Sequence, residues 1–271
     1  MEDDEERSSE GDYSNMNENT TESLHVAVDE EDGVVSSETQ SLMARQKPSL
    51  HEMVAGAVFC ALSFLVHLGT PNDRPIPYYQ LEDGEYVLDL SKNEEFDGDT
   101  VPDVLLGLIA VALPFLIQTA LCHFVLHHGL SSSFCCYCVA VGLNALATES
   151  TKQYVGYLRP SFYQLCQPSD DYQDCTSDTA SDSHKSLPSG HASQSFCGLI
   201  LLTLFVRNHF GKGPTFRHRL LAIAALLPMA LALFIAASRV HDNKHFPADV
   251  VGGAVLGGSI GQYVYGIYFY E

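Results

Sequence analysis

Two histidines and one aspartate have the spacing expected of a nucleophile, its orienting partner and a proton donor. His245 and Asp249 are four residues apart, and Pro247 between them suits the first position of a helix. Asp249 would then lie in the first helical turn and accept a hydrogen bond from one imidazole nitrogen of His245, leaving the other nitrogen free as a nucleophile. His191 is a separate histidine that could protonate a leaving oxygen. These residues predict nucleophilic group transfer.

Three cations and a turn that opens an apolar segment could bind the transferred group. Lys152, Arg159 and Arg239 lie at the ends of otherwise apolar segments. Ser189 and Gly190 directly precede such a segment, so their backbone N–H groups could join the positive end of a helix dipole. Cations and a helix N-terminus together predict a phosphate-binding pocket.

Each of these groups also has a purely structural interpretation. The three cations could simply extend their charged ends to a membrane interface, and the Ser189–Gly190 turn could be a plain helix cap. The His245–Asp249 pair could likewise be a structural cap. Glu149 is expected to pair with a nearby cation, and no functional role is expected for three further residues: His184, His241 and Lys244.

The apolar segments that must position these residues are long enough to cross a membrane. Five runs contain no Asp, Glu, Lys or Arg, and the longest, Val104–Thr148, has 45 residues. A membrane helix needs about 20 mostly apolar residues, so this run must hold two helices separated by the turn at 127–133. Buried helices of a soluble protein are the alternative, but five such runs leave too little polar surface. The sequence therefore predicts an all-α polytopic membrane protein, a bundle of six transmembrane helices near residues 53–70, 104–127, 134–151, 191–207, 220–237 and 250–268.

A short basic loop sets the expected orientation of this bundle. Residues 207–219 hold four Lys/Arg and no acidic residue, so the positive-inside rule places them in the cytosol. With six spans, both termini are also cytosolic, and segments 71–103, 152–190 and 238–249 are extracytoplasmic. The catalytic and phosphate-binding candidates all fall on this second side, although the orientation was argued from the basic loop alone.

Two of the eight cysteines, Cys166 and Cys175, lie in one extracytoplasmic segment, whereas the other six fall within predicted spans. Because the extracytoplasmic compartment is oxidising, we expect a disulfide between them. Two free surface thiols are the alternative.

Acidic charge is concentrated at the N-terminus. Residues 1–45 contain 14 of the 34 acidic residues and only two of the 14 basic ones. Such a segment cannot bury enough apolar surface to offset its ordering entropy, so we expect a disordered cytosolic tail, followed by a membrane domain over residues 46–271. The formal net charge of −20 argues against a nucleic-acid-binding protein, which needs a basic surface.

Three motifs together resemble those of the type 2 phosphatidic acid phosphatase (PAP2) superfamily. They are Lys152-x6-Arg159-Pro160, Pro188-Ser189-Gly190-His191 and Ser238-Arg239-x5-His245-x3-Asp249. The six-span layout is similar to the lipid phosphate phosphatase branch of that family, and the resemblance extends from about residue 50 to 268. Tyr157 is a departure, because many lipid phosphatases have a basic residue there; this leaves the substrate preference open.

The resemblance implies a role for each matched residue. His245 would attack phosphorus to form a phosphohistidine, Asp249 would orient it, and His191 would donate a proton to the leaving alcohol. The phosphate oxygens would be held by Lys152, Arg159, Ser189, Gly190 and Arg239. The resemblance also implies that no metal or other cofactor is required, and relatives carry cysteines after the first motif as this chain does.

Residues and resemblance together predict a lipid phosphate phosphatase, acting on monoesters such as phosphatidic acid, lysophosphatidic acid or sphingoid phosphates. Its partners would be the phosphorylated lipid and the bilayer, without nucleic acid, and a homo-oligomer is left open. The active site would face the lumen or the extracellular space, at the plasma membrane or an endomembrane such as the ER or Golgi. The alternatives are a phosphatase of lipid pyrophosphates (diacylglycerol or polyprenyl pyrophosphate), a catalytically silent membrane scaffold, and a transporter with an anion site.

Overall fold

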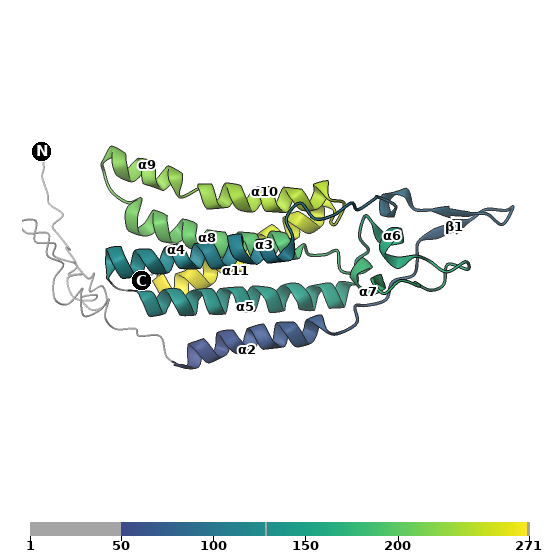
Figure 1. Cartoon of the computed structure of the whole chain (residues 1–271), viewed down its shortest axis with the longest axis horizontal. Coiled ribbons are helices and arrows are strands. Elements are labelled where there is room, and N and C mark those ends of the chain that lie inside the picture. The colour runs from purple at the N-terminus through teal and green to yellow at the C-terminus, as the bar shows by residue number, and fades with distance from the viewer. Residues whose placement is uncertain (1–49, 128, 270–271) are drawn as a thin grey trace, which may run out of the picture. The chain divides into compact units, whose positions relative to one another are not determined.

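The computed structural model describes residues 50–127 and 129–269 (Figure 1). The predicted acidic tail, residues 1–45, lies outside the described residues. Helices make up most of the described chain, and two short strands, β1 (Tyr78–Gln80) and β2 (Tyr86–Leu88), pair as an antiparallel hairpin. The predicted all-α fold class is confirmed.

Among the described residues, five helical segments are long and apolar enough to cross a membrane. They are α2 (Leu50–His67), the segment Asp103–Leu126, α5 (Leu130–Val155), the pair α9 (Phe216–Ala224) and α10 (Leu227–His241), and α11 (Pro247–Phe269). The segment from Asp103 to Leu126 consists of α3 (Asp103–Gly107), the π-helical turn η2 (Leu108–Ala112), α4 (Leu113–Leu121) and a second π-helical turn, η3 (Cys122–Leu126). These segments coincide with five of the six predicted spans.

The remaining predicted span coincides with α8 (Gly190–Phe210), which is long enough to cross a membrane but less apolar than the other five. Its first turns carry polar side chains, among them His191, Ser193 and Gln194. Eleven of its 21 residues are buried, and it packs against α5, α10 and α11. Because α8 lies at the centre of the bundle, it needs less apolar surface than a lipid-facing helix. The count of six spans stays a prediction.

The outward faces of the helices are apolar, as expected of a protein in a bilayer. On α2, Val54, Phe64 and Leu65 are 51%, 61% and 63% exposed, and α11 exposes Val251 and Val255 to a similar degree. Large apolar surfaces of this kind are not left open to water in soluble proteins. Together with the apolar helix lengths, they identify a multi-pass membrane protein.

Glycines let α11 approach α8 closely. A side chain at Gly257 would place its Cβ 1.9 Å from the backbone oxygen of Ser193, and at Gly253 it would lie 2.4 Å from that of Ser189. Gly258, on another face of α11, has open space around it. Gly253 and Gly257 therefore serve close packing within the fold. This packing holds the beginning of α8 against the beginning of α11, where the motif residues lie.

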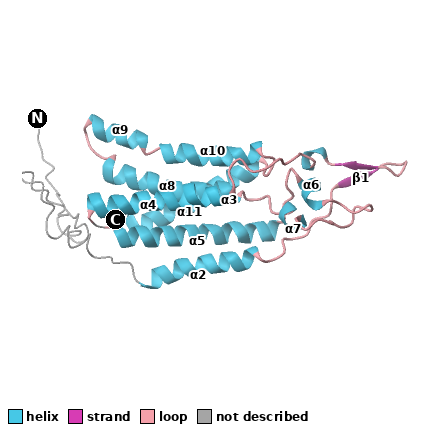
Figure 2. Cartoon of the chain, in the orientation of Figure 1, coloured by secondary structure: helices cyan, strands magenta, loops and turns pink. Residues whose placement is uncertain are grey.

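The loops, the hairpin and the short helices α6 (Phe162–Cys166) and α7 (Ala180–Ser183) gather at one end of the long helices (Figure 2). They share a small core of Ile76, Leu158, Phe162 and Tyr163. A disulfide joins Cys166 to Cys175 beside this core. The sequence treated these segments only as extracytoplasmic loops; in the structure they form a folded cap over the polar end of the bundle.

Candidate active site

The three motifs converge at the end of the bundle that carries this cap. Lys152 lies in the last turn of α5, His191 in the first turn of α8, Arg239 near the end of α10, and His245 two residues before α11. A cavity of about 350 Å³ is lined by six of the eight predicted site residues: Lys152, Arg159, Gly190, His191, Arg239 and His245. Ser189 and Asp249 are buried behind its wall.

His245 is held in the state required of a nucleophile. It is only 4% exposed, and its Nδ1 lies 2.7 Å from the backbone oxygen of Ser186. A carbonyl oxygen only accepts hydrogen bonds, so Nδ1 carries the proton and Nε2 keeps the lone pair. Burial, reinforced by the positive charges of Arg159 and Lys152, holds the pKa of His245 well below its ordinary value, so the imidazole is neutral.

Asp249 is placed differently from the sequence expectation. Its carboxylate accepts hydrogen bonds from Ser186 Oγ at 2.6 Å and from the backbone N–H of Phe246 at 2.9 Å. The expected hydrogen bond to His245 is made instead by the Ser186 carbonyl. Asp249 thus orients His245 only indirectly. It holds Ser186, which contacts the ring of His245, and Phe246, which follows His245 in the chain. Ser186 was missed by the sequence analysis, because it lies 59 positions from His245 and outside the three motifs.

The turn at the start of α8 also departs from expectation. The backbone N–H of Ser189 donates to the Asp249 carbonyl at 2.9 Å, and its hydroxyl caps the helix at Ala192 N. Ser189 therefore joins α8 to α11 and does not present its own N–H to the cavity. Gly190 does line the cavity, where a Cβ would lie 3.1 Å from Lys152 Nζ, so the missing side chain makes room for this cation.

His191 faces the segment that leads into α3. Its Nε2 donates to the backbone oxygen of Val101 at 2.8 Å and lies 3.7 Å from the carboxylate of Asp103. The segment 99–103 was not predicted to take part in the site. In the structure, its contacts with His191 place it over the cavity that the three motifs line.

Each of the three cations predicted to bind phosphate is paired with a carboxylate. Arg239 is 1% exposed and donates to Asp99 at 2.7 Å and to Asp242. Arg159 pairs with Asp182 at 2.8 Å. The third pair is Lys152–Glu149, at 3.5 Å.

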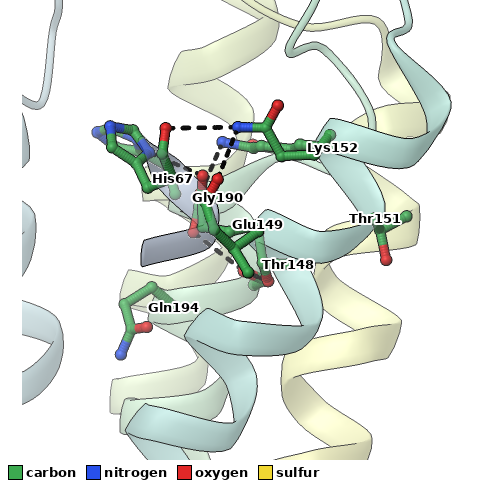
Figure 3. Close-up of polar contacts among 12 residues, drawn as sticks. His67, Thr148, Glu149, Thr151, Lys152, Gly190 and Gln194 are labelled. Carbon is green, nitrogen blue, oxygen red and sulfur yellow. Dashed lines mark hydrogen bonds and ion pairs between the residues drawn. The ribbon is translucent and has the colours of Figure 1, made fainter. Parts of the chain in front are cut away.

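The third pair is extended by a residue from α2. Glu149 also contacts His67 Nδ1 at 2.8 Å, and Figure 3 shows His67, Glu149 and Lys152 turned toward one another. Glu149 thus pairs with a nearby cation as expected. Because His67 comes from α2, this contact joins the lipid-facing helix to the wall of the cavity.

The carboxylate beside Arg159 is ionised. Burial alone would raise the pKa of Asp182, but the charges of Arg159 and Lys244 outweigh it and hold that pKa below its ordinary value. The guanidinium of Arg159 also donates from Nη1 to the backbone oxygen of Lys244 at 3.3 Å. Arg159 therefore also holds the backbone of Lys244, which directly precedes His245.

Lys244 is a fourth cation of the cavity, although no role was expected for it. Its Nζ lies 3.9 Å from the centre of the Phe96 ring. Burial lowers the pKa of Lys244, and the nearby Arg159 lowers it further. Position in the sequence could not distinguish Lys244 from His241, three residues earlier. Only the structure shows that Lys244 lines the cavity whereas His241 is exposed.

At Tyr157, the missing basic residue is replaced by cations from elsewhere in the chain. The Arg74 guanidinium lies 5.4 Å from the centre of the Tyr157 ring, and Lys92 Nζ lies 5.5 Å from it. Lys92 also lies 4.1 Å from the ring of Phe246, which follows His245. Positive charge is therefore present near this position, supplied from the segment 71–103.

Fold and site together define a helical multi-pass membrane protein in which a buried histidine and several cations line one cavity. The sequence pattern described as the PAP2 superfamily matches residues 133–271, and the chain belongs to this family.

Individual relatives extend the similarity toward the N-terminus. Lipid phosphate phosphatase 2 of Arabidopsis thaliana is 29% identical over 80% of this chain and 76% of its own length. Lipid phosphate phosphatase 1 of the same plant is 29% identical over 70% of this chain, which spans 60% of that relative. The probable diacylglycerol pyrophosphate phosphatase 1 of Schizosaccharomyces pombe is 31% identical over 62% of this chain and 64% of its own length. No solved structure matches the chain significantly.

Proposed function

We propose that this protein is a metal-independent hydrolase of lipid phosphate monoesters, of the phosphatidic acid, lysophosphatidic acid or sphingoid phosphate class. The observation that carries the proposal is the state of His245: a buried neutral imidazole, protonated on Nδ1, in a cavity lined by cations. The names of the plant relatives support the substrate class.

In the proposed reaction, His245 Nε2 attacks phosphorus and the bond from phosphorus to the lipid oxygen breaks. His191, protonated on both nitrogens, exchanges its contact with Val101 for the leaving oxygen and donates the Nε2 proton to it. Lys152, Arg159 and Arg239 balance the charge that develops on the phosphoryl oxygens. Water then attacks the phosphohistidine, gives its proton to His191, and releases inorganic phosphate and neutral His245.

Phosphate release from phosphatidic acid in detergent micelles, with EDTA present, tests this proposal. We expect release by the wild type and a loss of at least about 1,000-fold for His245→Ala, because the covalent step needs this nitrogen. His218→Ala, in the basic loop, is the matched control and should retain wild-type release. Full activity of His245→Ala would refute the proposed nucleophile.

A lipid pyrophosphate is the second candidate substrate. The observation that favours it is Lys244, because a fourth cation in the cavity could hold a second phosphate beside the one attacked. The Schizosaccharomyces pombe relative is named for such a substrate. A side-by-side panel of phosphatidic acid and diacylglycerol pyrophosphate, with wild type and Lys244→Met, separates the two: a loss confined to the pyrophosphate would identify it as the substrate that uses Lys244.

We propose that the site faces the lumen or the extracellular space and that both termini are cytosolic. α8 supports this orientation, because it begins at the site and ends at the basic loop 207–219, which the positive-inside rule assigns to the cytosol. Cysteines introduced singly at exposed Glu94 and at Lys212 would be labelled from opposite sides of sealed vesicles. Labelling of both from the same side would contradict the orientation.

A further inference from the structure

The cavity continues beyond the phosphate-binding cations, between α5 and α8, and this continuation is polar. Thr148 lies one turn before Lys152 on α5, and Asn144 lies one turn before Thr148. Ser193 and Gln194 come from the first turns of α8, and all four residues line the cavity. In Figure 3, Thr148 and Gln194 lie on the same side as Glu149, whereas Thr151 points away.

Two amide groups here have buried atoms without a hydrogen-bond partner among the described residues. Asn144 is fully buried, and its Nδ2 donates to Gln194 Oε1 at 3.2 Å. Asn144 Oδ1 and Gln194 Nε2 are left unpaired. Exchanging oxygen and nitrogen in both amides gives the same outcome, one unused donor and one unused acceptor. Buried amide groups are normally satisfied, so this pair is suited to a polar ligand group.

We propose that Asn144 and Gln194 bind a free hydroxyl of the lipid alcohol, carried on the carbon next to the one that bears the phosphate. A hydroxyl is both donor and acceptor and complements the two unused atoms, whereas an ester carbonyl could satisfy only the donor. Gln194 lies one turn beyond His191, which is the proposed donor to the leaving oxygen. This inference rests on the proposed function and predicts that, within its substrate class, lipid phosphates with a free hydroxyl on that carbon are hydrolysed preferentially.

The contact between α5 and α8 does not depend on these amides alone. Thr148 and Ser193 share a hydrogen bond of 2.9 Å between the same two helices. Thr203 offers a matched comparison, because its hydroxyl on α8 is also buried and without a partner among the described residues, yet it lies outside the residues that line the cavity. A variant of Thr203 therefore shows the effect of losing a buried polar group, and a variant of Gln194 shows the effect of losing a contact to the ligand.

The test compares kcat/KM for lysophosphatidic acid and for its analogue without the glycerol 2-hydroxyl, 1-acyl-propane-1,3-diol phosphate. Water-soluble p-nitrophenyl phosphate, which carries no neighbouring hydroxyl, serves as a third substrate. We expect the wild type to prefer lysophosphatidic acid over the analogue about 10-fold, the size of effect expected when buried polar groups lose a hydrogen-bond partner. Gln194→Met, which keeps the side-chain length, should bring this ratio close to one by slowing lysophosphatidic acid alone. Asn144→Leu should act in the same direction.

Controls and outcomes separate this inference from the proposed function. Thr203→Val should leave both this ratio and the rate of p-nitrophenyl phosphate hydrolysis at their wild-type values. A wild-type ratio of one, or an unchanged ratio in Gln194→Met, would overturn the hydroxyl site while leaving the phosphatase intact. No phosphate release from any lipid by the wild type would overturn both. If Asn144→Leu does not fold, the result for the less buried Gln194 decides.

Discussion

The pairing of Arg239 with Asp99 predicts that a carboxylate of the protein competes with phosphate. Asp99 Oδ1 lies 2.7 Å from Arg239 Nη1, and the Asp99 side chain is 31% exposed against 1% for Arg239. A phosphate that binds this guanidinium must share it with, or displace, the carboxylate. Asp99→Asn removes the charge with little change of shape, while Asp242 continues to anchor Arg239.

The size of this competition follows from the geometry. A hydrogen bond between charged groups contributes about 1.5–3 kcal/mol, and partial exposure of Asp99 reduces it to about 1–2 kcal/mol. Because 1.4 kcal/mol corresponds to a factor of ten, inorganic phosphate should bind Asp99→Asn about 5- to 30-fold more tightly than the wild type.

The assay is the inhibition constant of inorganic phosphate against hydrolysis of p-nitrophenyl phosphate at low ionic strength. Asp97→Asn is the matched control, since Asp97 is an exposed carboxylate two residues away and its loss changes the net charge equally. Its inhibition constant should stay within about twofold of the wild type, as expected for an exposed charge. An inhibition constant in Asp99→Asn that is equal to or higher than that of the wild type would refute the reasoning. It would indicate that Asp99 holds Arg239 in position for phosphate.

Three further predictions concern pH, the first motif and helix packing. Because the pKa of His245 is lowered, its imidazole stays neutral as the pH falls below 6.5. The fall in kcat/KM that is due to protonation of His245 should therefore occur below pH 6.5. A fall due to this residue at pH 6.5 or above would contradict the prediction. Arg159→Lys keeps the charge but not the contacts to both Asp182 and the Lys244 carbonyl, and kcat/KM should fall about 10- to 100-fold; a wild-type value would show that charge alone suffices. Gly257→Ala should lower the free energy of unfolding in detergent by about 1–3 kcal/mol, because its Cβ would meet the Ser193 backbone, whereas Gly258→Ala has open space; equal effects would contradict the packing.

Composition and residue spacing were enough to predict the helical class and to single out the residues of the three motifs. Long runs without charge have few alternatives to membrane helices, because unpaired backbone groups cannot remain in a bilayer. The roles expected of His245, His191 and the cations likewise follow from residue type and spacing. These local features need no knowledge of how distant segments pack.

The partners that these residues contact could not be predicted from the sequence, because they come from distant segments. The residue that contacts His245 Nδ1, Ser186, is 59 positions away in the chain. Arg239 contacts Asp99, which is 140 positions away, and His191 contacts Val101, which is 90 positions away. Pairings over such distances depend on how the cap folds over the bundle, and no local pattern records that.

The polar residues within the spans show the same limit. Asn144 and Thr151 are both polar residues of α5, but Asn144 lines the cavity and Thr151 hydrogen-bonds to the Ala147 carbonyl of its own helix. The two residues are seven positions apart and lie on nearly the same face of α5, because seven residues make almost two full turns. Which of them reaches the cavity therefore depends on the segments that pack against α5 at each level, and so it is a property of the whole bundle.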